Sequence, residues 1–290
     1  MTYQVQSSDT SYEAEQVQLA ILRKRGAAGR GDLMRSLTNT TRRLSWNSLV
    51  QRRSDLSRQE CAYFFIGLNY GEELGQEVRV YPKPPINSLI LEEKLLSGEQ
   101  EIVAALTPVV EVFQDLAIEY SIGGSLASSV HGIPRATADA DLVADLHEKH
   151  VGPLIARLQD NYYISETAIR EALAHHSSFN LIHLETGFKL DIFVLQTDQF
   201  NQSSFGRAVL LPISTSTPQQ FRLHSPEDIL LQKLNWYREG KQVSDRQWND
   251  ILGILKMQEQ LDYHYLTQWA EQLGLSDLLT SAREQAGRSS

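Results

Sequence analysis

Two short motifs lie close together near the middle of this 290-residue chain. Gly123-Gly124-Ser125 is followed, after a spacer of thirteen residues, by Asp139-Ala140-Asp141-Leu142. Side chains two residues apart on a strand point to the same face of a sheet, so we expect Asp139 and Asp141 to lie side by side. A glycine pair ahead of a helix lets backbone amides approach an anion. Together the motifs predict a site for a metal-bound triphosphate.

Composition is that of a soluble globular protein. The chain contains no run of about 18 apolar residues, and the polar residues 1–10 lack the apolar core of a signal peptide. We therefore expect a cytoplasmic protein with no membrane segment. The single cysteine, Cys61, lies in an apolar run and is expected to be a buried, inert thiol.

Charge is unevenly distributed along the chain. The net charge of −9 argues against an indiscriminate nucleic-acid binder, yet residues 23–58 carry ten Lys or Arg and two Asp, a net charge of +8. Such a patch is a candidate docking surface for phosphates. The alternative is a solvated helix face, or a face complementary to the acidic remainder of the chain.

Apolar periodicity and turn residues divide the chain into regions of different class. We expect disorder at 1–10, a helical N-terminal module at 11–81, a mixed α/β core at 86–224 and a C-terminal helical lobe at 225–290. A proline-rich linker, residues 81–85, closes the N-terminal module. The predicted fold class is therefore α/β (α+β) with helical regions at both ends.

The same signals predict individual elements. The N-terminal module is expected to hold helices at 12–25, 33–37, 45–53, 57–70 and 72–80, with a capping box at the start of the fourth. In the core we expect helices at 88–96, 98–119, 125–131 and 151–160 and strands at 120–122, 138–144, 179–184, 188–195 and 208–213. The tail is expected to hold helices at 226–238, 244–258, 262–273 and 276–285. Pro108 is expected to mark a helix start or kink rather than a helix interior.

A third carboxylate, Asp191, belongs with the Asp139 and Asp141 pair. It lies in the apolar segment 188–194, where an unpaired charge is costly, so a metal ion or a cationic side chain is expected as its partner. Mg²⁺ prefers hard oxygen ligands and also binds substrate phosphates. Two such ions can stabilise the attacking and leaving oxygens of an in-line displacement, and we assign Asp139 and Asp141 to both metal positions (Mg²⁺ or Mn²⁺). Asp191 would complete the site for an attacking hydroxyl and accept its proton, unless metal coordination makes a separate base unnecessary.

The order of these motifs resembles that of the DNA polymerase β-type nucleotidyltransferase superfamily. Within it, the run from His131 to Leu142 is similar to the bacterial abortive-infection (AbiEii-like) nucleotidyltransferase toxins. Two later helices of that family are also matched. The first, which carries an aspartate and a lysine, resembles residues 228–234, and the second, which carries an arginine and an aspartate, resembles residues 246–251. The resemblance covers residues 86–279 and leaves out the N-terminal helices.

The resemblance implies a polymerase β-like core with a mixed sheet. It also implies magnesium-dependent transfer of a nucleoside monophosphate from a nucleoside triphosphate (NTP) to an acceptor, with release of pyrophosphate. The acceptor would be RNA, a protein or a small hydroxylated compound, and a toxin-like member would have an antitoxin partner. The residues that match the family's functional positions are Asp139, Asp141 and Asp191 for metals, and Gly123, Gly124, Ser125, Arg135 and Lys233 for the nucleotide. For Arg135 the alternative is a pair with a carboxylate that holds the turn.

Two other functions remain open. The same fold without catalysis would be a nucleotide-binding or protein-binding module, and the retention of all three acids counts against this. Residues 11–81 could instead be an interaction or antitoxin-like module joined to a toxin-like enzyme.

Ala140 departs from the family, which usually has a branched apolar residue at this position. The change weakens the strand slightly but keeps both carboxylates.

Overall fold

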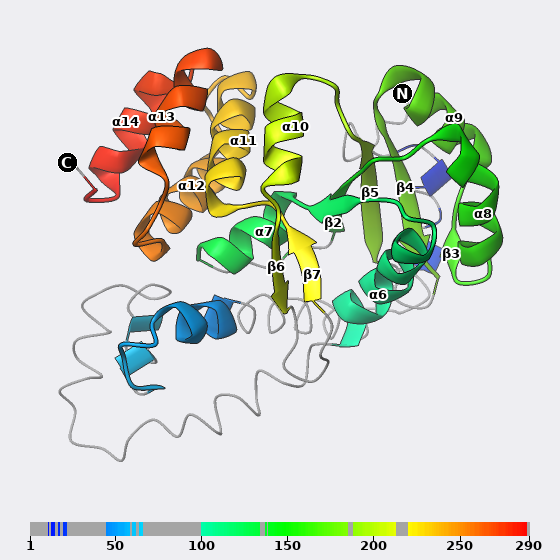
Figure 1. Cartoon of the computed structure of the whole chain (residues 1–290), viewed down its shortest axis with the longest axis horizontal. Helices are drawn as coiled ribbons and strands as arrows, with labels where there is room; N and C mark the ends of the chain where they lie inside the picture. Colours follow the sequence, from blue (N-terminus) through cyan, green and yellow to red (C-terminus); the bar gives the residue numbers. More distant parts are fainter. Residues whose placement is uncertain are drawn as a thin grey trace. The chain divides into compact units, whose positions relative to one another are not determined.

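A computed structural model describes the parts of the chain that are drawn in colour in Figure 1. These are residues 11, 13–14, 17, 20–21, 45–58, 60–61, 64–65, 100–133, 137, 139–184, 188–212 and 220–288. The predicted helices at 33–37, 72–80 and 88–96 lie outside them, as does Arg135.

The described residues form two compact units. The first contains those within Met1–Leu37, Glu99–Leu126 and Thr137–Ser225, and the second contains those within Thr38–Gly98, Ala127–Ala136 and Pro226–Ser290. The boundary between the units thus falls inside helix α7 (Gly124–His131). The segment limits predicted from the sequence, at 81, 86 and 224, stay a prediction.

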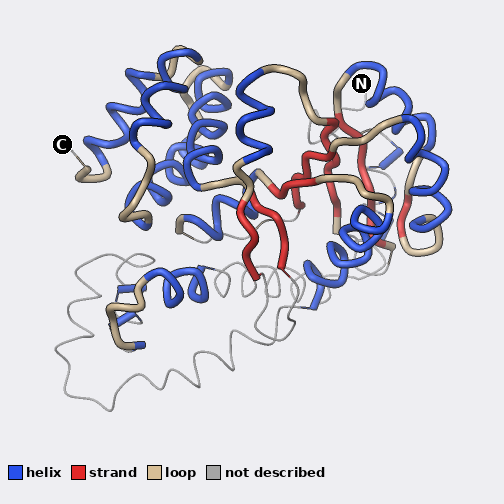
Figure 2. The backbone as a smooth tube through the Cα atoms, viewed as in Figure 1, coloured by secondary structure: helices blue, strands red, loops and turns tan. Residues whose placement is uncertain are grey.

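A seven-stranded mixed sheet forms the centre of the first unit (Figure 2). Its strand order is β3-β4-β5-β2-β1-β7-β6; β2 pairs with β5 and β1 with β7 in parallel, and the other neighbours are antiparallel. The strands are β1 Tyr120–Ile122, β2 Asp139–Ala144, β3 Tyr162–Tyr163, β4 Ser178–His183, β5 Lys189–Val194, β6 Val209–Pro212 and β7 Gln220–Leu223. The predicted α/β class with a mixed sheet is confirmed.

Strand β2 alternates between partly exposed and buried side chains. Asp139 and Asp141 are partly exposed, whereas Ala140 and Leu142 are fully buried. This is the period of two that a strand with one buried face requires. Strand β5, which lies between β4 and β2 in the sheet, is buried along almost its whole length. The polar residues of β2 therefore lie on the less covered face of the sheet.

Helices pack around this sheet. They are α6 Gln100–Asp115, α8 Glu148–Leu158, α9 Glu166–His175 and α10 Gln199–Gly206, together with the start of α7. Ser165 caps α9 by accepting a hydrogen bond from the Ala168 amide, and Asp198 caps α10 in the same way. Helix α9 packs against β4 and β5, and α8 packs on α9.

The expectation for Pro108 was wrong, because it lies inside α6. Proline there removes one backbone hydrogen bond. The apolar face of α6 is nevertheless fully buried at Ile102, Leu106 and Phe113. Burial of this face is the stabilising contribution that lets the helix continue through the proline.

The second unit is helical. Its C-terminal helices are α11 Pro226–Glu239, α12 Asp245–Met257, α13 Tyr263–Gln272 and α14 Ser276–Gln285. Ser244 and Asp262 cap α12 and α13, since each side chain accepts a hydrogen bond from a backbone amide of the first turn. All four helices were predicted to within a residue or two at each end.

A small apolar cluster joins the described part of the N-terminal region to the second unit's core. It consists of buried Trp46, Leu49, Cys61, Phe65 and Met257. The rings of Trp46 and Phe65 meet edge to face with centroids 5.6 Å apart. Cys61 is a free, buried thiol, as expected.

Near this cluster the predicted capping box is confirmed. The Ser57 amide donates to Glu60, and the Glu60 amide donates back to the Ser57 hydroxyl.

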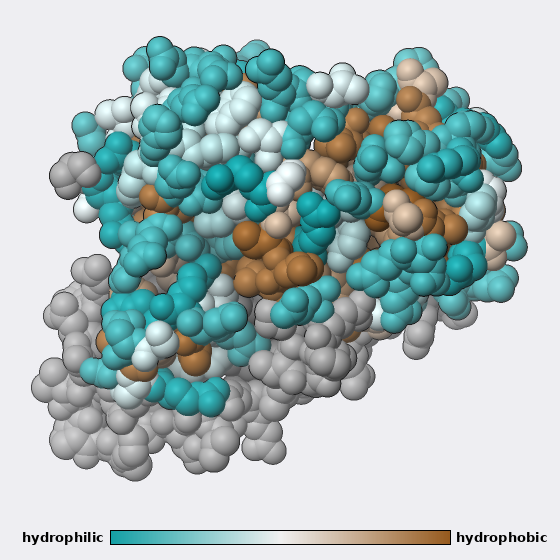
Figure 3. Space-filling view, in the orientation of Figure 1, coloured by the Kyte–Doolittle hydropathy of each residue, from teal (hydrophilic) through white to brown (hydrophobic). Residues whose placement is uncertain are grey.

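No helix in the described part of the chain is long and apolar enough to cross a membrane. The face of the molecule in Figure 3 is largely hydrophilic, with hydrophobic side chains gathered in a few patches, one of them around β6 and β7. Leu210 on β6 is 58% exposed and lies on an edge strand of the sheet.

Candidate functional site

The glycine turn packs directly against Asp141. Strand β1 ends at Ile122, which pairs with Leu142 of β2, and the Gly123 amide donates to the Asp141 carbonyl at 2.8 Å. Gly124 has a φ of +57°, and a Cβ built on it would lie 1.6 Å from Oδ2 of Asp141. Only glycine fits this position, because any side chain would displace the carboxylate. The two motifs that are separated by thirteen residues in sequence are therefore in contact in the structure.

The three predicted carboxylates share one face of the sheet. Asp139 and Asp141 are two residues apart on β2, and Asp141 pairs in register with Asp191 on the parallel strand β5. Partners in register on adjacent strands project to the same side, and neighbouring strands lie about 4.8 Å apart. Asp139 and Asp141 are partly exposed, whereas Asp191 is 0% exposed. We call Asp139, Asp141 and Asp191 the carboxylate face.

Asp191 is held by two side chains that sequence reasoning missed. Lys189 places its Nζ 2.6 Å from Oδ2 of Asp191, and Asn180 donates from Nδ2 to Oδ1, also at 2.6 Å. All three side chains are buried. The expectation that Asp191 needs a charged partner is met by the cationic side chain of Lys189. The available signal was a lysine two residues before an aspartate in an otherwise apolar strand.

Strand register explains this arrangement. Lys189 is the partner of Asp139 across β2 and β5, and Asn180 of β4 is the partner of Asp191. Lys189 therefore lies on the carboxylate face, among three negative charges. The sequence motif indicated three carboxylates and no lysine on this face. With Lys189 included, the four charged groups have a net charge of −2.

A hydrogen-bond chain connects the N-terminal region to Asp191. The Ser11 amide donates to Oδ1 of Asn180 at 3.1 Å, and Asn180 in turn donates to Asp191. The Ser11 hydroxyl accepts from the Ala14 amide, so Ser11 caps the helical residues that follow it. Ala14 itself is buried. The described part of the predicted helix 12–25 is helical and belongs to the same unit as the carboxylate face.

The donor set on β2 suits one divalent cation. Asp139 and Asp141 offer partly exposed carboxylate oxygens, which are the hard ligands that Mg²⁺ and Mn²⁺ prefer. Thr137 orients Asp139 by donating to its Oδ1 at 2.7 Å. Within the described ranges, no three His, Cys, Asp or Glu side chains converge on one point as metal ligands would. Asp191 does not complete such a set, because both of its oxygens accept hydrogen bonds from Lys189 and Asn180.

His224 lies beside the glycine turn and was not predicted. Its amide donates to the Ile122 carbonyl at 2.9 Å, which fixes the end of β7 to the end of β1. Its Nδ1 lies 3.2 Å from the Ser204 hydroxyl. Burial, with a smaller contribution from the positive charge of Arg222, lowers the pKa of His224 to about 4. The imidazole is therefore neutral at pH 7 and supports the turn rather than adding charge to it.

Lys233 lies in the second unit, where it is paired with Asp250. The lysine Nζ is 2.9 Å from Oδ2 of Asp250, and both side chains are almost fully buried. The ring of Trp236 lies 5.5 Å from the same Nζ, and the Ser128 hydroxyl lies 3.4 Å from Oδ2 of Asp250. A contact between Lys233 and a phosphate stays a prediction, and such a contact would have to compete with Asp250.

Other predicted features also lie in the second unit. Asp228 is fully buried and accepts a hydrogen bond from the Tyr265 hydroxyl at 2.7 Å. Within the basic stretch at 23–58, Arg52 donates to the Val130 carbonyl, and burial lowers its pKa to about 10. Arg53 pairs with Asp55 and Glu259. These two arginines therefore make contacts within the protein, as the non-docking interpretation expects.

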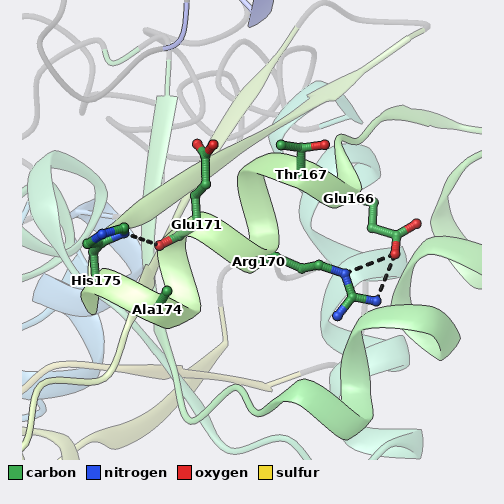
Figure 4. Close-up of a pocket in the computed structure, with 6 residues that line it drawn as sticks. All are labelled: Glu166, Thr167, Arg170, Glu171, Ala174 and His175. Atoms are coloured by element: carbon green, nitrogen blue, oxygen red, sulfur yellow. Dashed lines mark hydrogen bonds and ion pairs between the residues drawn. The ribbon is translucent and has the colours of Figure 1, made fainter.

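A hollow on α9 is lined by none of these residues. Its volume is about 470 Å³, and Figure 4 shows that its lining comes from one helix. The lining residues are Glu166, Thr167, Arg170, Glu171, Ala174 and His175. Arg170 already pairs with Glu166 at 2.7 Å, and both side chains are largely exposed. The hollow contains none of the carboxylates of β2 or β5.

Comparisons with known proteins give a distant structural likeness. No family model matches this chain, and no curated protein matches it. Among solved structures it is similar to the crystal structure of an antigenic nucleotidyltransferase-like protein from Paracoccidioides brasiliensis, with 20% identity over 62% of this chain and 91% of that chain, and a TM-score of 0.38. A TM-score this low is no basis for assigning the fold or the activity of that protein to this chain.

Proposed function

We propose that this protein is a magnesium-dependent nucleotidyltransferase that moves a nucleoside monophosphate from an NTP to a hydroxyl acceptor. The supporting observation is the contact between the glycine turn and Asp141, with Asp139 and Asp191 on the same face of the sheet. A glycine turn at a helix start, in contact with one of two neighbouring carboxylates, suits a metal-bound triphosphate.

The residues of the turn would bind and orient the triphosphate. The amides at the start of α7, from Gly124 and Ser125, lie at a helix N-terminus, where the backbone dipoles favour a negative charge. Asp139 and Asp141 would hold the divalent cation. Bound magnesium supplies charge neutralisation at the phosphate oxygens and favours deprotonation of the attacking hydroxyl.

The transfer itself is an in-line displacement. The acceptor oxygen forms a bond to the α-phosphorus, the bond from that phosphorus to the bridging oxygen of the β-phosphate breaks, and pyrophosphate leaves with the electron pair. The acceptor proton passes to solvent water. The protein contributes position and electrostatic stabilisation, which account for most of the catalysis in reactions of this kind.

The acceptor class follows from the sequence resemblance alone. The similarity of residues 131–142 to AbiEii-like toxins favours RNA, with proteins and small hydroxylated compounds as the other candidates. A toxin-like role with an antitoxin partner belongs to the same proposal. The helical residues of the N-terminal region, which contact Asn180 through Ser11, are a candidate regulatory segment.

Label transfer tests this function. Purified protein is incubated with Mg²⁺, each NTP labelled at the α-phosphorus, and a mixture of cellular RNA and protein. We expect labelled acceptor with the wild type and none with the Asp139→Asn plus Asp141→Asn double variant. The matched control is Asp160→Asn, which removes one exposed carboxylate outside the site. Absence of label with all four NTPs, or equal label with the double variant, contradicts the proposal.

A second function is favoured by two buried ion pairs, one in each unit. Lys189 binds Asp191 and Lys233 binds Asp250, so two groups assigned to catalysis are engaged within the protein. A protein that binds a nucleotide without turning it over would have this arrangement. Equilibrium binding of a labelled NTP that stays intact for hours, with an affinity insensitive to Asp191→Asn, would support this second function over transfer.

A further inference from the structure

The strongest feature that the proposed function leaves unexplained is Lys189. It is 5% exposed, it lies on β5 opposite Asp139, and its Nζ sits 2.6 Å from Asp191. A buried ammonium requires a negative partner, and a buried carboxylate requires a positive one. On the carboxylate face, however, a divalent cation could serve the same purpose. Lys189 therefore occupies a position for which a metal ion competes.

We propose that Lys189 is a built-in counter-ion that keeps Asp191 out of the resting metal site. This inference rests on the proposed function. In the resting protein, one divalent cation binds at Asp139 and Asp141. Asp191 becomes a ligand for a second cation only when the Lys189 ammonium leaves it.

The Lys189 ammonium and a divalent cation cannot bind Asp191 at the same time. Oδ2 accepts from Lys189 and Oδ1 from Asn180, so the protein already engages both oxygens. A divalent cation bound to Oδ2 would have to stand close to the ammonium, where two like charges repel strongly in a buried setting. Asn180 is neutral, so Oδ1 of Asp191 can accept from Asn180 and bind a cation at the same time. Lys189 cannot, so it must move.

Lys189 is able to move because of its side chain. A lysine carries its charge on a flexible four-carbon stem, unlike an arginine with its planar, rigid fork. The partly exposed residues Asp139 and Asp141 lie on the same face and offer the displaced ammonium another negative region. Binding of a triphosphate, which carries negative charge of its own, would also draw the ammonium away from Asp191.

The proposal differs from a purely structural ion pair in what happens when Lys189 is removed. A structural pair predicts a less stable protein that still binds one cation, held somewhat more tightly because a nearby positive charge is gone. A counter-ion predicts that Lys189→Met exposes Asp191 to cations, so that a second cation binds and the lost stability returns when Mn²⁺ is added. The number of bound cations therefore decides between them without any measurement of activity.

Mn²⁺ titration of the full chain, followed by electron paramagnetic resonance and by thermal unfolding, tests this. The wild type should bind one Mn²⁺. Lys189→Met should bind a second, and should gain more thermal stability from Mn²⁺ than the wild type. The control Lys149→Met, which removes an exposed lysine of α8, should behave like the wild type.

The double variant Lys189→Met plus Asp191→Asn covers the case in which the single variant does not fold. It replaces a buried ion pair with two neutral groups, which proteins commonly tolerate. It should bind one Mn²⁺ with wild-type affinity. Loss of that Mn²⁺ would show that Asp191 is already a ligand at rest, and would overturn the proposal. A single bound Mn²⁺ in Lys189→Met, or a second Mn²⁺ that is still bound by the double variant, would also overturn it.

These outcomes are separable from the proposed function. If no NTP gives label transfer but the Mn²⁺ results are as expected, the counter-ion role stands and the transfer proposal falls. If transfer occurs but Lys189→Met binds a single Mn²⁺, the counter-ion role falls and transfer stands.

Discussion

Replacement of Gly124 by alanine is the sharpest test of the contact between the turn and the carboxylate face. A Cβ at this position would lie 1.6 Å from Oδ2 and 2.5 Å from Cγ of Asp141. No rotation of a methyl group relieves such a contact, so the Asp141 carboxylate must swing away. The backbone adds strain, because φ is +57° at Gly124.

The expected loss of stability follows from these two terms. A side chain in the left-handed region costs about 1–2 kcal/mol, and overpacking costs about 1–3 kcal/mol. Together they amount to about 2–5 kcal/mol, which corresponds to a fall in Tm of about 3–8 °C for a chain of 290 residues. Affinity for Mn²⁺ should fall as well, because Asp141 is a proposed ligand.

Differential scanning calorimetry and Mn²⁺ titration measure both effects. The matched control is Gly152→Ala in α8, where a Cβ would meet no atom within 4 Å. Alanine at a helix position should stabilise by about 0.5–1 kcal/mol. Adding Asp141→Ala to Gly124→Ala removes the two nearest clashing atoms and should recover part of the lost stability. A Gly124→Ala protein as stable as the wild type, with the same Mn²⁺ affinity, would refute the reasoning.

Two other predictions concern buried charge. Lys233→Met leaves the Asp250 carboxylate buried without its cation and should lower the free energy of unfolding by about 3–5 kcal/mol. The double variant Lys233→Met plus Asp250→Leu should lower it less. Urea unfolding measures both values, and equal losses would contradict the pairing. Because the pKa of His224 is lowered to about 4, the unfolded chain binds more protons between pH 6.5 and 4. Stability that is fully present above pH 6.5 should therefore fall as the pH drops toward 4, by about 3 kcal/mol. His224→Gln should flatten this pH dependence in calorimetry, and an unchanged slope would exclude His224 as its source.

Local signals were sufficient to predict the elements that build the site. The glycine pair, the alternation of polar and apolar residues around Asp139 and the apolar segment before Asp191 were read correctly as turn and strands. Each of these signals lies within a few residues of the element that it predicts. The two strands β4 and β5 were also foreseen, at 179–184 and 188–195, and they pair in the antiparallel sense.

Long-range pairing could not be predicted in the same way. Asn180 meets Asp191 only because β4 and β5 pair in one particular register, and a shift of one residue would turn Asn180 to the other face. The ion pair between Lys233 and Asp250 joins two helices, and a helical lysine is ordinarily solvated.

Two strands were missed for a related reason. Strand β3 has two residues and β7 has four, too few for a period of two to stand out. Their existence depends on neighbours supplied by distant parts of the chain.

The most direct test of the account is a crystal structure of the full chain with Mn²⁺ and an NTP analogue that cannot be cleaved between the α- and β-phosphates. We predict anomalous density for Mn²⁺ between Asp139 and Asp141, with the triphosphate against the amides of Gly124 and Ser125. Mn²⁺ bound elsewhere, or a triphosphate bound away from the start of α7, would contradict the central claim that the glycine turn and the carboxylate face form one site.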